Sequence, residues 1–189
     1  LLMDAEGFIK IIDFGFAKKL PYRKKGKLLS QTFTLCGTPE YIAPEILLTK
    51  GHDKAVDCWA LGCFVYALLC GSTPFCFDDQ QQIFRAVVQS DKYLAFPKGF
   101  PDDAKILIRG LITQSPTQRL GCLKNGLHDV FDSEIYSDFD WAALAARAMP
   151  APYQPPVKDH KDTSNIDQID DPNEKIPKFK GHQDIFVRF

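Results

Sequence analysis

The sequence predicts a mainly α-helical domain that opens with a small β-hairpin and continues into an extended C-terminal tail. Three observations predict this class: a continuous apolar segment of helix length at 55–70, two shorter segments with helical periodicity, and a change to proline-rich composition near Ala148. With 189 residues, the chain is long enough for one well-buried domain and an appendage.

The first 45 residues combine a hairpin pattern with a long loop. Residues 1–12 read LLMDAEGFIKII, two apolar runs around a turn that Gly7 can make. From Asp13 to Glu45 there is little helical periodicity, and Gly and Pro recur. Irregular loops of more than about 15 residues in a compact domain are usually functional or disordered.

The segment AVDCWALGCFVYALLC, at 55–70, predicts a helix that is apolar on every face and therefore buried inside the domain. Its uninterrupted part after Asp57 has 13 residues. A bilayer crossing needs about 18 to 20, so a buried helix is favoured over a membrane span. Residues 79–88 and 102–113 carry apolar side chains at helical spacing and predict two further helices.

Composition narrows the class of protein. The net charge is −1, with acidic and basic residues nearly balanced, so no whole-chain attraction to nucleic acid or to an anionic membrane is expected. The six cysteines form no CxxC pair, which favours reduced thiols and a cytoplasmic protein.

The tail begins where the composition changes. The sequence AMPAPYQPP, at 148–156, is followed by a stretch rich in Asp, Asn, Ser and Pro that cannot bury enough apolar surface to fold alone. We expect it to lie extended on the domain. The division that follows is a domain over 1–136 and a C-terminal region over 137–189.

Two ordered motifs point to chemistry. Asp13-Phe14-Gly15 is a magnesium-binding signature of protein kinases, although three residues alone are a weak signal. The stretch TLCGTPEYIAPE, at 34–45, is far more specific, because it contains the Ala-Pro-Glu that ends a kinase activation segment.

On these motifs the chain resembles the C-terminal lobe and tail of an AGC-group serine/threonine protein kinase, most similar to the cyclic-nucleotide-dependent kinases. The similarity continues through DCWALGCFVYALLCGSTPF, SPTQRLG, DTSN and a terminal FxxF, and it covers essentially the whole chain. It implies transfer of phosphate from ATP, with Mg²⁺, to Ser or Thr of protein substrates. It also implies a possible regulatory domain or subunit that binds cyclic nucleotide.

The resemblance implies a nucleotide and metal site. Asp13 would hold magnesium against the ATP phosphates, because a hard cation prefers carboxylate oxygen. Leu2 and Ile12 would contribute to the nucleotide site, with Leu2 in the floor of the adenine pocket. Phe14 and Gly15 match structural positions of the motif.

Thr34 matches the activation-loop phosphosite of the group, the target of an upstream activating kinase. A phosphate adds about −1.5 to −2 charge and can order a loop by pairing with basic groups. Lys18 matches one such partner in the family. Thr32 and Ser30 remain alternative phosphosites.

The same stretch would bind the substrate. Thr38 matches the threonine that contacts the catalytic aspartate, and Glu40 resembles a carboxylate facing basic substrate residues. An apolar pocket for the residue after the target hydroxyl would come from Leu35, Pro39 and Ile42.

Two further carboxylates have structural roles by resemblance. Glu45 would pair with Arg119 in a buried bidentate ion pair. Asp57 would accept hydrogen bonds from the catalytic-loop backbone, or else be an ordinary N-terminal helix carboxylate favoured by the helix dipole; the sequence alone leaves both open.

One apolar segment and one basic segment lie outside the stretch at 34–45. Phe186 and Phe189 match the hydrophobic motif that docks on the small lobe of AGC kinases. The basic residues between Lys18 and Lys27 are expected to be a solvated run, with a docking or localisation role as the minority alternative.

Two positions depart from the family. Tyr66 is followed by Ala67 where arginine-selective relatives carry Glu, which puts selection for arginine before the target in doubt. Ile166 follows DTSN where the family has a phenylalanine that closes over the adenine.

No His-Arg-Asp occurs in these residues. Aligned with the family, the chain is expected to begin just after the catalytic loop. The N-terminal lobe, with its Gly-rich loop and ATP-positioning Lys, is expected to be missing. Two hypotheses follow: part of an active Ser/Thr kinase, inactive when isolated, or a catalytically dead binding module that presents a substrate-like groove or the FxxF tail.

Overall fold

The computed structural model describes residues 1–20, 31–159 and 161–166. It divides the chain into two units, one formed by residues 1–12 with 150–189 and the other by residues 13–149. The predicted mainly helical class is confirmed, with a single two-stranded sheet among the described residues.

The first unit contains the predicted hairpin. Strands β1 (Leu2–Met3) and β2 (Ile9–Lys10) pair antiparallel, with Leu2 opposite Lys10. The Asp4 carboxylate closes the turn by accepting hydrogen bonds from two backbone N–H groups, at 2.9 and 3.1 Å. Gly7 has φ 88°, and a Cβ there would lie 2.3 Å from the Tyr153 carbonyl oxygen, so both the turn and this contact require glycine.

The described part of the tail, 150–159 and 161–166, has neither helix nor strand. Side chains of this segment bond its own backbone: Asp162 accepts from the N–H groups of Lys158 and Ser164, both at 2.9 Å. The described part of the tail therefore contains local turns, and the expectation that the tail lies extended on the domain stays a prediction.

The second unit is built from short helices around one long helix. The long helix is α2 (Ala55–Cys70), which coincides with the predicted segment. The others, in chain order, are η1 (Pro39–Tyr41), α1 (Pro44–Leu47), α3 (Gln80–Val88), α4 (Ser90–Tyr93), α5 (Asp102–Leu111), η2 (Pro116–Gln118), α6 (His128–Phe131), η3 (Glu134–Tyr136) and α7 (Trp141–Ala145).

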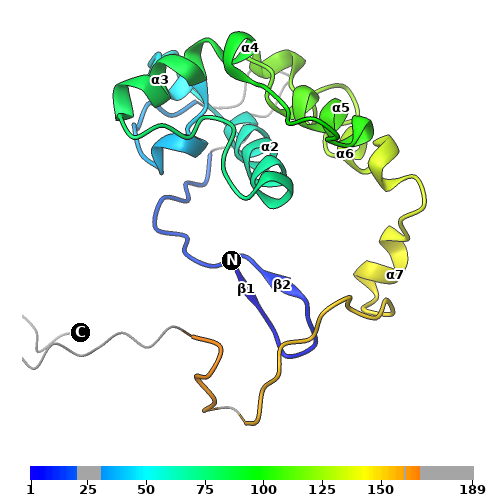
Figure 1. The fold of residues 1–189 in the computed structure, drawn as a ribbon. Coiled ribbons are helices and arrows are strands. Elements are labelled where there is room, and N and C mark those ends of the chain that lie inside the picture. Colours follow the sequence, from blue (N-terminus) through cyan, green and yellow to red (C-terminus); the bar gives the residue numbers. More distant parts are fainter. Residues whose placement is uncertain (21–30, 160, 167–189) are drawn as a thin grey trace, which may run out of the picture. The chain divides into compact units, whose positions relative to one another are not determined.

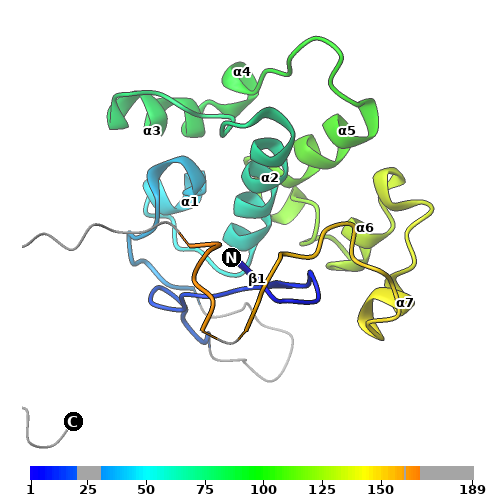
Figure 2. The same ribbon diagram turned by 60° about the horizontal axis from the view of Figure 1, so that its bottom comes forward.

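Helix α2 lies at the centre of this unit, with α3 to one side and α5 and α6 to the other (Figures 1 and 2). Its Trp59 is fully buried and stacks on Phe75, with ring centroids 5.8 Å apart. Gly62 brings α2 close to the end of α5, since a Cβ there would lie 2.8 Å from the Leu111 Cβ. The core thus forms where α2 meets the amphipathic face of α5, and the buried side chains of α3 join it through η1 and α1.

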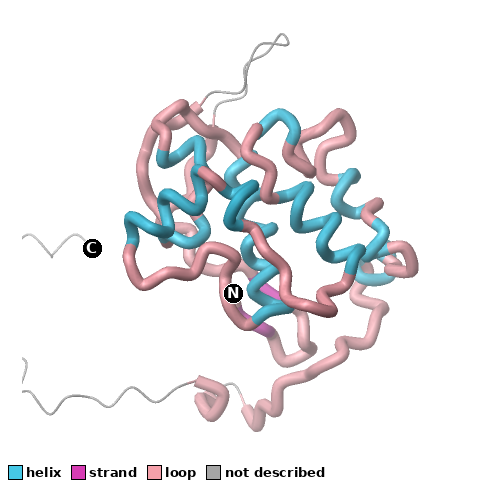
Figure 3. Tube along the Cα trace, turned by 45° about the horizontal axis from the view of Figure 1, so that its top comes forward, coloured by secondary structure: helices cyan, strands magenta, loops and turns pink. Residues whose placement is uncertain are grey.

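The expectation that α2 is buried on every face is wrong for the residues described. Leu61, Leu68 and Leu69 are exposed, with Leu68 at 68%. Among the described elements, α5 packs most extensively on α2, and Figure 3 shows the helices of this unit in cyan joined by loops in pink. Among the described residues, no helix has both the length and the apolar character required to span a bilayer.

Candidate functional site

Residues 13–20 and 31–45 are mostly irregular, and the two ends of the segment from Asp13 to Glu45 differ in burial. Within the described parts, 13–20 and 31–45, Thr32 pairs with His52 through two backbone hydrogen bonds of 2.9 Å. Both residues are buried. This bridge fixes the middle of the segment to the turn that precedes α2.

Asp13 is an exposed residue in the left-handed backbone region, with φ 64°. Its Oδ1 accepts a hydrogen bond from the Gly15 N–H at 3.1 Å, the kind of local bond that lets Asp adopt this conformation. Phe14 and Gly15 are exposed beside it. The result is a carboxylate presented on the surface of this unit.

The arrangement at Asp13 suits a hard cation shared with another ligand. Magnesium typically binds through one or two protein carboxylates together with phosphate oxygens and water. Within 1–20, 31–159 and 161–166, no three His, Cys, Asp or Glu side chains gather as a metal site. Asp13 offers one exposed carboxylate, and its role as a magnesium ligand stays a prediction.

Leu2 and Ile12 belong to the hairpin unit. Leu2 lies in β1 and Ile12 follows β2, and both side chains are exposed. They belong to a set of exposed apolar side chains in this unit, which also includes Leu1, Met3, Ile9 and Ile11.

Lys18 lies near Thr34, the predicted phosphosite, and bonds Thr32, one of the alternatives. Its Nζ donates to Thr32 Oγ1 at 2.9 Å, and this oxygen lies 3.4 Å from Thr34 Oγ1. Thr34 is exposed whereas Thr32 is buried. The Lys18 ammonium is thus connected to Thr34 through the Thr32 hydroxyl, and Thr34 is the more accessible of the two threonines. Ser30 lies outside the described residues.

The predicted substrate-binding residues have different environments. Thr38 is exposed, and Pro39 and Glu40 begin η1 in half-buried positions. Leu35 is 60% exposed, while Ile42 is 5% exposed and belongs to the core.

Glu40 has a partner that the sequence did not indicate. Thr73, in the turn after α2, donates its hydroxyl to Glu40 Oε2. This bond holds the carboxylate against the loop that follows α2. Thr73 is separated from Glu40 by 33 residues, so no local pattern could have identified it.

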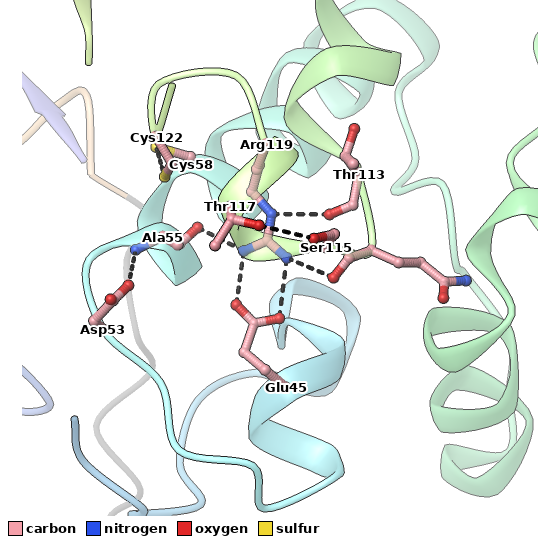
Figure 4. Close-up of polar contacts among 10 residues, drawn as sticks. Glu45, Asp53, Ala55, Cys58, Thr113, Ser115, Thr117, Arg119 and Cys122 are labelled. Carbon is pink, nitrogen blue, oxygen red and sulfur yellow. Dashed lines mark hydrogen bonds and ion pairs between the residues drawn. The ribbon is translucent and has the colours of Figure 1, made fainter. Parts of the chain in front are cut away.

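Glu45 and Arg119 form a buried bidentate ion pair (Figure 4). Arg119 Nη1 lies 2.7 Å from Glu45 Oε1, and Arg119 Nη2 lies 3.0 Å from Glu45 Oε2. The Arg119 side chain is 0% exposed and the Glu45 side chain is 5% exposed. Glu45 lies in the first turn of α1, so this pair anchors the end of the segment.

The remaining donors of Arg119 are also satisfied. Nη1 donates to the Ala55 carbonyl at 2.7 Å and Nε to the Thr113 carbonyl at 3.0 Å (Figure 4). The guanidinium carbon lies 5.2 Å from the centroid of the Trp59 ring. A buried charge is tolerated only when it is paired and hydrogen-bonded, and this one is both.

Asp57 lies in the first turn of α2, where its carboxylate faces the positive end of the helix dipole. Burial raises the pKa of its carboxyl above the ordinary value. The predicted role of Asp57 toward a catalytic loop stays a prediction.

The predicted docking residues of the tail, Phe186 and Phe189, lie outside the described residues.

The comparisons with known proteins agree with the motifs. Residues 1–131 match the protein kinase domain family. The chain is 44% identical over 168 residues to human cGMP-dependent protein kinase 2, covering 89% of this chain and 21% of that protein. It is 45% identical over 171 residues to the cAMP-dependent protein kinase catalytic subunit of Dictyostelium discoideum, covering 90% and 25%. The chain thus spans about a fifth to a quarter of these relatives.

Proposed function

The chain belongs to the protein kinase domain family, and from that premise we propose that the protein containing it phosphorylates Ser or Thr residues of other proteins with ATP. The observation that carries the proposal is the segment from Asp13 to Glu45. It presents an exposed carboxylate at one end, a lysine beside two threonines in the middle, and a buried Glu45–Arg119 anchor at the other end.

The chemistry needs positioning and charge neutralisation, because charge is spread over the phosphoryl oxygens in the transition state. Asp13 would hold magnesium through its carboxylate, and the bound ion supplies that neutralisation. By the family resemblance alone, Leu2 and Ile12 would contribute to the adenine side of the nucleotide site in the complete protein. The similarity to cAMP- and cGMP-dependent protein kinases supports this class of reaction.

Regulation would act through Thr34. A phosphate on its exposed hydroxyl would lie within reach of Lys18. Lys18 bonds the Thr32 hydroxyl, and the oxygen of that hydroxyl lies 3.4 Å from Thr34 Oγ1. If Lys18 bonds the phosphate dianion instead of the neutral Thr32 hydroxyl, the loop becomes more ordered, since hydrogen bonds between charged groups are stronger. An upstream kinase that phosphorylates Thr34 would therefore activate the protein.

The substrate would be a protein segment with basic residues near the target hydroxyl. Glu40 supplies a carboxylate oriented by Thr73, and Thr38 and Pro39 lie next to it in the chain. Leu35 supplies exposed apolar surface for the residue after the target. Selection for arginine two positions before the target would be weak, because Ala67 follows Tyr66 in α2.

Two partners of the complete protein follow from the same family. The relatives are named as cyclic-nucleotide-dependent kinases, which supports a regulatory domain or subunit that binds cAMP or cGMP. The terminal FxxF supports docking on a small lobe. All six cysteines are free thiols, which favours the cytoplasm as the working compartment.

The experiment that tests the proposal is a phosphotransfer assay on the protein expressed from its complete transcript. We expect incorporation of phosphate from ATP into a basic serine peptide, and its loss in Asp13→Asn. Asp91→Asn is the matched control, because Asp91 is an exposed residue of α4. Equal activity of Asp13→Asn and the control would overturn the proposal.

The 189 residues expressed by themselves should be inactive in the same assay, because they contain no His-Arg-Asp base. Phosphate incorporation by this chain that disappears in Asp13→Asn would contradict that part of the proposal. Binding of the same peptide without transfer is the result expected for the 189 residues alone.

A further inference from the structure

Two cysteines from distant parts of the chain lie together in the second unit. Cys58 lies in the first half of α2, and Cys122 lies in the loop between η2 and α6. Their sulfur atoms are 3.9 Å apart, although 64 residues separate them (Figure 4). Cys58 is buried, whereas Cys122 is half-buried and therefore within reach of small solutes.

The approach of the loop to α2 depends on the residue before Cys122. Gly121 has φ 88°, a conformation that side chains disfavour. A Cβ at Gly121 would lie only 2.7 Å from Cys58 Sγ. Glycine at this position therefore lets the loop come close enough for the two sulfurs to meet.

We propose that Cys58 and Cys122 form an oxidative modification site, at which a hydroperoxide converts the two thiols into a reversible intramolecular disulfide. The bond requires the sulfurs to move from 3.9 Å to about 2.05 Å. Rotation of the half-buried Cys122 side chain on its loop supplies most of this movement. In reducing compartments such disulfides are transient and sense oxidants.

The reaction is balanced over two steps. The sulfur of Cys122 attacks a peroxide oxygen and the O–O bond breaks, which gives Cys122 sulfenic acid and releases water or an alcohol. The sulfur of Cys58 then attacks the Cys122 sulfur. The S–S bond forms, the S–O bond breaks, and the hydroxyl leaves as water with the Cys58 proton. Two thiols lose two electrons, and one hydroperoxide gains them.

Burial assigns the order of the two steps. The pKa of Cys58 is raised to about 11, first by burial and then by the neighbouring Cys122 sulfur, so little thiolate forms there. Cys63 is more deeply buried and its pKa is raised to about 12. The half-buried Cys122 therefore meets the oxidant first, and Cys58 serves as the resolving thiol.

The disulfide would brace the Arg119 anchor. Cys122 is three residues after Arg119, and Cys58 is three residues after Ala55, whose carbonyl accepts from Arg119 (Figure 4). The bond would connect the same loop to the same turn of α2. Because it closes a loop of 64 residues, it removes conformational freedom mainly from the unfolded chain.

The experiment uses the full chain, reduced, freed of reductant and treated with hydrogen peroxide. The sample is denatured in N-ethylmaleimide and digested without reduction. Trypsin leaves Cys58, Cys63, Cys70 and Cys76 in one peptide, so chymotrypsin is added to cut after Trp59. We expect a peptide pair that joins Cys58 to Cys122 and has lost the mass of two hydrogen atoms, and we expect dithiothreitol to release it.

Thermal unfolding tests the bracing role. The oxidised chain should melt about 10 °C higher than the reduced chain, given the length of the closed loop. Cys122→Ser should lose both the linked peptide and this rise. Cys76→Ser is the matched control, since Cys76 is an exposed cysteine, and it should retain both.

Capture of Cys58 and Cys122 as separate maleimide adducts, under conditions that oxidise Cys76, would overturn the proposal. So would a disulfide that joins either of them to another cysteine. Peptide mapping of the unmutated chain decides this even if Cys122→Ser fails to fold. A linked chain that melts no higher than the reduced chain would refute the bracing role.

Discussion

The two ends of the segment from residue 13 to residue 45 are held in opposite ways. At the far end, Glu45 and Arg119 are buried, and the guanidinium also bonds three backbone carbonyls. At the near end, Asp13 is exposed, and its carboxylate accepts one local bond from Gly15. The difference teaches that stability is concentrated at the anchor, while the end proposed to bind ligands keeps its carboxylate accessible.

The largest expected effect breaks the anchor. Arg119→Ala should lower the free energy of unfolding by about 3 to 5 kcal/mol, because it leaves Glu45 buried without its partner. Urea unfolding followed by circular dichroism measures this. Arg109→Ala is the control, since Arg109 is exposed on α5 with its guanidinium carbon 5.3 Å from the Phe96 ring centroid, and it should cost less than about 1 kcal/mol. An unchanged midpoint for Arg119→Ala would show that the pair contributes nothing to stability.

The second effect tests Thr34, the exposed threonine near Lys18. In the protein from the complete transcript, Thr34→Ala should reduce kinase activity about tenfold, because the phosphate that attracts Lys18 is lost. Lys18→Met should reduce the activating effect of phosphorylation without preventing phosphorylation. The measurement is initial rate against phosphate content at residue 34. Full activity of an unphosphorylated Thr34→Ala protein would remove Thr34 from the regulatory proposal.

The third effect concerns the middle of the segment. Thr32→Val keeps the shape of the side chain but removes the hydroxyl that accepts from Lys18, at 2.9 Å. The loss should be about 1 kcal/mol of unfolding free energy, the usual net value of one hydrogen bond. Thr34→Val, at an exposed position, should change stability by less. Equal midpoints for the two variants in urea would assign Thr32 no special structural role.

The smallest effect tests Asp57, whose carboxylate has no ion pair like that of Glu45 among the described residues. Burial raises the pKa of Asp57 in the folded chain above its unfolded value. The stability that this shift contributes is therefore full below the unfolded pKa and is lost as the pH rises through the folded pKa.

At pH 7, Asp57→Asn should consequently stabilise the 189-residue chain by less than about 1 kcal/mol, after solvent screening is considered. The gain should vanish below about pH 3, where the aspartate is protonated. Asp53→Asn is the control, because Asn can still accept the bond from Ala55 N–H. A destabilised Asp57→Asn at pH 7 would show that this carboxylate has a stabilising partner.

Much of the fold could be predicted because it depends on neighbours in the sequence. The helix expected at 55–70 coincides with α2, and the hairpin expected at 1–12 contains β1 and β2. Both follow from periodicity and turn residues, which act over a few residues. The family was also predictable, since Asp13-Phe14-Gly15 and the stretch at 34–45 are contiguous motifs.

The sequence by itself therefore determined the elements, the family and the residues that carry its motifs. Tertiary structure decided which side of α2 is covered, that Thr32 rather than Thr34 bonds Lys18, and that Thr73 orients Glu40. It also placed Cys58 beside Cys122. Contacts across tens of residues depend on how whole elements pack, and no local propensity encodes that packing.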